Sequence, residues 1–85
     1  MAKIMKNCWC VEITLDTPSV KNLTCGIVVH DIREAEVALY FIQKYLPEDR
    51  VCLRYLPVPE GNHVLPWSPE RFFKLYTEMK TGKIY

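Results

Sequence analysis

The chain has 85 residues, of which 49% are hydrophobic and 25% are charged, and its formal net charge is +1. This composition excludes a disordered chain and predicts one small globular domain. The near-zero charge argues against a protein whose main activity is non-specific nucleic-acid binding, because neutralising phosphates needs a basic excess or a basic face. No run approaches the roughly 20 apolar residues of a membrane span, and residues 1–6 lead into no apolar signal segment. We therefore expect a cytoplasmic protein that contacts no membrane and keeps its four cysteines reduced.

Two strands are predicted in the first third of the chain. Residues 7–16 and 23–30 both alternate with a period of two, and the short connector between them favours an antiparallel hairpin. The first face of the predicted hairpin is apolar: Trp9, Val11, Ile13, Leu15, Leu23, Cys25, Ile27 and Val29. Gly26, within the second strand, indicates a bulge or a close approach of another group to the backbone.

A helix is predicted from Asp31 to Pro47. Asp31 is a favourable N-cap, and Glu34 stands three residues later, as in a capping box. Pro47 ends the helix, because the residue before a proline is displaced from the α region. The apolar residues spaced for one face are Ile32, Ala35, Ala38, Leu39, Ile42 and Leu46, with Tyr45 at the edge of this stripe.

The last third of the chain predicts a strand, an ambiguous segment and a second helix. Residues 50–56 alternate as a strand, and a helix between two strands of one sheet allows the strand order 2-1-3. Residues 57–67 are open to two interpretations, a hairpin with a short edge strand at 63–65 or an extended loop stiffened by proline. Ser68 and Pro69 form a strong helix start, and Gly82 is the expected C-cap.

These elements predict an α+β fold: a small antiparallel or mixed sheet of three or four strands with two helices, in the order ββαβ(β)α. The chain contains no repeat and no linker, so residues 1–85 form a single domain, with residues 1–6 and 83–85 as expected flexible ends.

The sequence contains no motif for catalysis, metal binding or phosphate binding. Cys8 and Cys10 share a strand face, but their spacing matches no zinc module, even with Cys52 and either histidine added. A cysteine nucleophile would need an imidazole beside the thiol, which sequence alone does not supply. We therefore expect no cofactor, no metal ion and no catalytic residue.

Surplus apolar and aromatic side chains point instead to an interaction surface. The candidate residues for binding a partner are Val37, Tyr40, Phe41, Arg54, Trp67 and Phe73. The leading hypothesis is a non-enzymatic interaction or regulatory module that binds a protein partner or a second copy of itself. On this hypothesis Phe41→Ala should cost the isolated fold less than about 1 kcal/mol and should weaken association by about 2 kcal/mol or more.

Two alternatives remain open at this stage. A nucleic-acid-binding accessory protein is suggested by cations and rings in the second half of the chain: Arg50, Arg54, Arg71, Lys74, Tyr55, Trp67 and Phe73. The small size of the chain also suggests a phage or mobile-element inhibitor of a host defence system.

The second face of the predicted sheet carries little charge for a solvated surface. Its residues are Cys8, Cys10, Thr14, Thr24, Val28, His30, Arg54 and Leu56. We expect this face to be covered, either by the second helix or by a partner.

Overall fold

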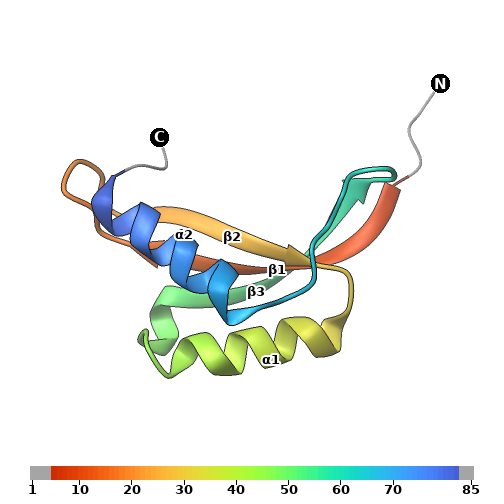
Figure 1. The fold of residues 1–85 in the computed structure, drawn as a ribbon, viewed down its shortest axis with the longest axis horizontal. Helices are drawn as coiled ribbons and strands as arrows, with labels where there is room; N and C mark the ends of the chain where they lie inside the picture. The colour runs from red at the N-terminus through yellow and green to blue at the C-terminus, as the bar shows by residue number, and fades with distance from the viewer. Residues whose placement is uncertain (1–4, 83–85) are drawn as a thin grey trace.

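The computed structural model describes residues 5–82 and arranges them as three strands and two helices (Figure 1). The elements follow in the order β1 (Met5–Leu15), β2 (Leu23–Val29), α1 (Ile32–Gln43), the 3-10 helix η1 (Glu48–Arg50), β3 (Val51–Pro59) and α2 (Pro69–Thr81). The predicted α+β class and the order ββαβα are confirmed. The flexible ends expected at 1–4 and 83–85 lie outside the described residues.

The three strands form one antiparallel sheet in the order β2-β1-β3. β1 pairs with β2 from Trp9↔Val29 to Leu15↔Leu23, and with β3 from Met5↔Pro59 to Ile13↔Val51. β2 and β3 therefore run in the same direction on either side of β1, as the predicted strand order requires. The β1–β2 register has no interruption at Gly26, which removes the bulge interpretation.

The β1–β3 pair is longer than the sequence predicted. β1 begins at Met5 and β3 continues to Pro59, three residues past the predicted end at position 56. Residues 5 and 6 are therefore part of a strand and not of a flexible end. Pro57 and Pro59 are compatible with β3 because it is an edge strand. Between positions 60 and 68 the chain makes a turn and an extended loop without a fourth strand, so the loop interpretation is correct.

The ends of both helices follow the expected capping chemistry with two exceptions, the first being that α1 ends at Gln43 with Lys44 as its C-cap, before the end predicted at Pro47. Asp31 accepts a hydrogen bond from the Arg33 amide at 3.0 Å, Ser68 caps α2, and Gly82 ends α2 in the left-handed conformation. Glu34 does not complete a capping box. Its carboxylate accepts a hydrogen bond from the backbone N–H of Trp67, so it fixes the loop that precedes α2.

The hydrophobic core lies between one face of the sheet and both helices. Its buried members are Val11, Ile13, Leu15, Ile27, Val29, Ala35, Ala38, Ile42, Leu46, Val51, Phe72 and Met79. Phe72 and Met79 belong to α2, so this helix packs on the same side of the sheet as α1. Within residues 5–82, neither helix is long and apolar enough to cross a membrane.

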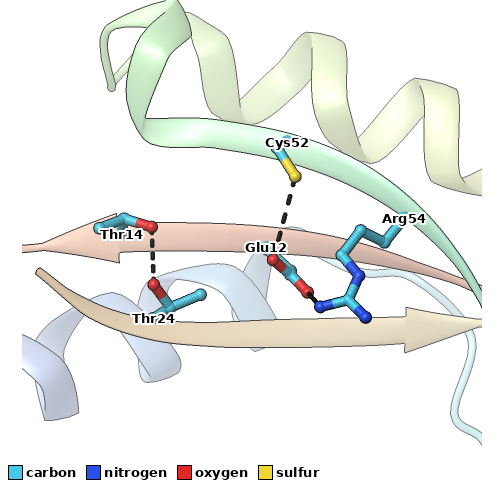
Figure 2. Close-up of polar contacts among 5 residues, drawn as sticks. All are labelled: Glu12, Thr14, Thr24, Cys52 and Arg54. Carbon is cyan, nitrogen blue, oxygen red and sulfur yellow. Dashed lines mark hydrogen bonds and ion pairs between the residues drawn. The ribbon is translucent and has the colours of Figure 1, made fainter.

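The opposite face of the sheet, called the open face below, has no helix in front of it (Figure 2). Of the two covers expected from the sequence, the second helix is therefore excluded. Three strands supply this face, whose residues include Cys8, Cys10, Glu12, Thr14, Thr24, Val28, Cys52, Arg54 and Leu56.

Candidate interaction surface

Five aromatic rings gather where α1, α2 and the loop before α2 meet. The ring of Phe41 lies 5.3 Å from Tyr45, 5.6 Å from Trp67, 6.1 Å from Phe72 and 5.9 Å from Phe73, measured between ring centroids. The pairs of Phe41 with Trp67, Phe72 and Phe73 are edge-to-face, an arrangement that adds to the energy of simple burial. This aromatic cluster joins the two helices.

The loop before α2 holds Trp67 in the cluster through a set of polar contacts. The Arg71 guanidinium donates to the carbonyl oxygens of Leu65 at 2.7 Å and Pro66 at 2.9 Å. The Glu34 carboxylate accepts a hydrogen bond from the Trp67 amide. A side chain from each helix therefore fixes the backbone that leads into this residue.

The outer side of the aromatic cluster is exposed. Phe72 is buried, but Phe73 is 42% exposed and Tyr45 is 55% exposed. Val37 and Tyr40, on the outward side of α1, are 58% and 68% exposed. We call these four exposed residues, Val37, Tyr40, Tyr45 and Phe73, the helical patch.

A cation borders this patch. The Lys44 ammonium lies 4.9 Å from the centroid of the Tyr40 ring, a cation–π distance. The patch therefore combines large rings with one positive charge, and two of its rings, Tyr45 and Phe73, pack against buried Phe72.

Five of the six candidate residues expected from the sequence lie on one side of the molecule, Val37, Tyr40, Phe41, Trp67 and Phe73, and three of these, Phe41, Trp67 and Phe73, meet in the aromatic cluster. They lie on α1, on α2 and on the loop that precedes it, on the helical side of the molecule. Arg54 is separate from them. It projects from the open face, where its guanidinium pairs with Glu12 at 2.9 Å (Figure 2).

The structure corrects the expectation for Phe41. Its ring is half-buried against the hydrophobic core and surrounded by the other rings of the cluster. A substitution there removes contacts within the chain, so we now expect a larger stability cost than the sequence predicted.

Sequence reasoning also missed Tyr45. The residue lies at the edge of the apolar stripe of α1, which gave no sign that its ring is 55% exposed in the aromatic cluster.

Most cations proposed as phosphate ligands already have partners. Arg50 donates to the Asn22 side-chain oxygen at 3.1 Å, Arg54 pairs with Glu12, and Arg71 is bound to two carbonyl oxygens. Arg54 and the ring of Phe73 lie on different sides of the sheet. The arrangement does not form one surface that alternates cations and rings, although nucleic-acid binding itself stays an untested prediction.

The open face is polar but nearly neutral. Thr14 and Thr24 are joined across β1 and β2 by a 2.9 Å hydrogen bond, and the Cys52 thiol lies 3.9 Å from the Glu12 carboxylate (Figure 2). Cys8 and Cys10, on the central strand, are buried. The single Glu12–Arg54 pair is the only ion pair among the described residues.

The structure brings one thiol close to an imidazole. The Cys8 sulfur lies 3.7 Å from His30 Nδ1, but Cys8 has no exposed surface, so a substrate has no access to the sulfur. No third metal-ligating side chain completes a metal site around this pair within residues 5–82. All four cysteines are free thiols.

The four cysteines should react with an alkylating reagent at different rates. Burial, and then the nearby Glu12 carboxylate, raises the pKa of Cys10 from 9.0 to about 11, and burial also raises the pKa of Cys25. Because the thiolate is the nucleophile, we expect iodoacetamide at pH 8 to modify exposed Cys52 first and Cys8 and Cys10 last. Peptide mass spectrometry over time measures the order. Rapid alkylation of Cys8 in the folded protein would contradict it and would favour an activated nucleophile.

Comparison with protein-family models, with curated proteins and with solved structures gives no match.

Proposed function

We propose that the protein is a non-enzymatic interaction module that binds a protein partner through the helical patch. The observation that carries this proposal is the exposure of Phe73 and Tyr45 on top of an ordered aromatic cluster. Aromatic side chains held in one conformation lose little entropy on binding, and they dominate the energetics of many interfaces.

The electrostatics of the chain support a protein partner over a polyanion. The net charge is +1, and three of the cations suggested as phosphate ligands are engaged within the chain. The helical patch offers exposed rings with one lysine beside them, and aromatic residues are enriched at the centre of protein interfaces whereas the rim is polar.

Substitution of Phe73 tests this proposal. We expect Phe73→Ser to weaken binding of the partner by about 30-fold or more, the effect of losing an aromatic hot spot of about 2 kcal/mol. Val20→Ser is the matched control, since it also replaces an exposed apolar residue by serine but lies in the connector between β1 and β2. Affinity capture with quantitative mass spectrometry identifies proteins retained by wild type and by the control but lost with Phe73→Ser. The purified candidate is then titrated against all three chains.

A second variant protects the experiment against a folding defect. Phe73 contacts Phe41 and Tyr45, so its loss also affects stability. Tyr40 is 68% exposed, and Tyr40→Ser should change stability by no more than about 0.5 kcal/mol. If wild type, Phe73→Ser and Tyr40→Ser retain the same proteins in equal amounts, the helical patch is not the binding surface.

A further inference from the structure

The two edges of the sheet differ in how they are covered. α2 and the loop before it lie along the β2 side, where they and β2 line a shallow groove formed by Gly26, Ile27, Leu65, Arg71, Lys74, Leu75 and Glu78. β3 is the other edge strand. It contacts β1, α1 and η1, and no further described strand pairs with its outer side. The unpaired backbone groups of β3 therefore form an open edge.

The prolines of β3 reveal which backbone groups point outward. In an antiparallel pair, alternate residues exchange both hydrogen bonds with the neighbouring strand. Pro57 and Pro59 have no N–H, so they occupy the positions that face away from β1. Val51 has the same parity, and its N–H donates to the Glu48 carbonyl rather than to β1. The outward-facing residues of β3 are therefore the odd-numbered ones.

The free donors on this edge are few. The N–H of Val51 already donates to Glu48, and Pro57 and Pro59 have no N–H. The outward N–H groups that remain are those of Leu53 and Tyr55. The prolines thus protect the far end of the edge, while the segment from 51 to 56 stays open. It has no proline and no bulge, two usual devices that block pairing with another strand, and its one charged residue, Arg54, is paired with Glu12 of the same chain.

A second copy of β3 fits this segment in one register. Antiparallel pairing about a two-fold axis at Leu53 uses the N–H groups of Leu53 and Tyr55 in both copies and leaves Pro57 beyond the paired segment. An axis at Arg54 or Tyr55 directs the ring of Pro57 at a carbonyl of the second copy, and an axis at Cys52 leaves the Tyr55 donors unpaired.

The side chains in this register are complementary. Leu53 meets Leu53 of the second copy on the helical side of the sheet, and the exposed ring of Tyr55 comes opposite Val51. On the open face Arg54 comes opposite Cys52 of the second copy, beside the Glu12 that Cys52 already contacts at 3.9 Å. An axis at Arg54 would instead place two arginines directly opposite each other, which is destabilising.

One flank of α1 lies on the same side as the β3 edge. Phe41 and Tyr45 turn one flank of α1 toward α2, so the opposite flank, with Leu39 and Gln43, faces the β3 side. This flank of α1 would therefore border the strand pair on its helical side.

We propose that two copies of the chain pair antiparallel along β3, with Leu53 on the two-fold axis, to form one continuous six-stranded sheet. Such an isologous interface uses the same surface on both copies. It does not use Phe73 or Tyr45, so the proposal goes beyond partner binding and does not depend on it.

A charge placed at position 52 tests the register. Cys52→Lys puts each new lysine opposite Arg54 of the second copy, while Glu12 of its own chain favours it in the monomer. Two like-charge pairs should weaken the dimer about tenfold, with no loss of thermal stability at dilutions where the chain is monomeric. Thr24→Lys makes the same charge change on β2, away from the axis, and should leave the dimer unchanged. Sedimentation equilibrium over a concentration series measures all three chains.

A disulfide experiment tests the same geometry directly. Positions 52 and 54 form non-hydrogen-bonded pairs across the axis, about 4.5 Å apart at Cα, which suits a disulfide. In a Cys10→Ala background, which removes an intrachain thiol partner, Arg54→Cys should give a covalent dimer under oxidising conditions. Thr24→Cys in the same background is the control and should form no disulfide-linked dimer.

Each result of these two experiments either supports or overturns the proposed dimer. A bond that joins native Cys52 to the cysteine introduced at position 54 supports the proposal, and a bond between two introduced cysteines overturns this register. A wild-type chain that stays monomeric at every concentration, or a dimer insensitive to Cys52→Lys, overturns the β3 interface. Phe73→Ser should leave the dimer intact, so loss of partner binding and loss of the dimer are distinguishable.

Discussion

Phe72→Ala is expected to lower the free energy of unfolding by about 3–5 kcal/mol, the usual cost of deleting a buried phenylalanine ring. Phe72 is 1% exposed. Its ring lies 6.1 Å from Phe41 and 5.6 Å from Tyr76, so the cavity would open where α2 meets the core. A domain of this size has a stability of only about 5–10 kcal/mol, and the variant should therefore be close to unfolding at room temperature.

Urea denaturation of Phe72→Ala and of its neighbour Phe73→Ala measures this difference. The two residues are adjacent on α2, and the same atoms are removed, but Phe73 is 42% exposed. We expect Phe73→Ala to cost about 1 kcal/mol, the ordinary effect of a partly exposed substitution. Equal losses in the two variants would mean that α2 does not pack on the sheet through Phe72.

The packing of α2 marks the limit of what the sequence predicts about the site. The helical wheel of α1 places Phe41 well outside the apolar stripe, and that angle is correct. The wheel does not say which side of α1 the next helix will occupy. Because α2 docks on that side, Phe41 becomes an internal contact, whereas Phe73 becomes the exposed ring. Local periodicity fixes a face, but it takes the tertiary arrangement to decide what covers that face.

Local signals performed better for the fold. Strand alternation identified the faces of β1 and β2, since each residue's neighbour necessarily points the other way. Capping residues at Asp31, Ser68 and Gly82 located the helix ends, because their side chains or backbone satisfy orphan groups there. Pairing partners were harder to predict. The extension of β3 through Pro57 depends on Asn7 lying opposite it, and no local pattern specifies that pair.

Gly26→Ala is expected to destabilise the protein by about 1–3 kcal/mol, the range for overpacking a tightly filled position. A Cβ at this position would lie 2.3 Å from the Cys10 sulfur, far inside van der Waals contact. The backbone of Gly26 has ordinary strand geometry and is not in the left-handed region, so this collision is the reason for glycine. The sequence had left a bulge and a close approach as alternatives, and the structure shows the close approach.

The effect of Gly26→Ala on stability should change sign when the Cys10 sulfur is removed. In a Cys10→Ala background the space beside Gly26 is free, and Gly26→Ala should be neutral or stabilise the fold by about 0.4–1 kcal/mol, because alanine restricts the unfolded chain. A double-mutant cycle by urea denaturation gives the coupling between the two positions, which we expect to exceed about 1 kcal/mol. Equal effects of Gly26→Ala in both backgrounds would show that the Cys10 side chain adopts another rotamer at little cost in free energy. The glycine would then have to be explained by the backbone of β1, whose Val11 carbonyl is the next-nearest atom at 3.5 Å.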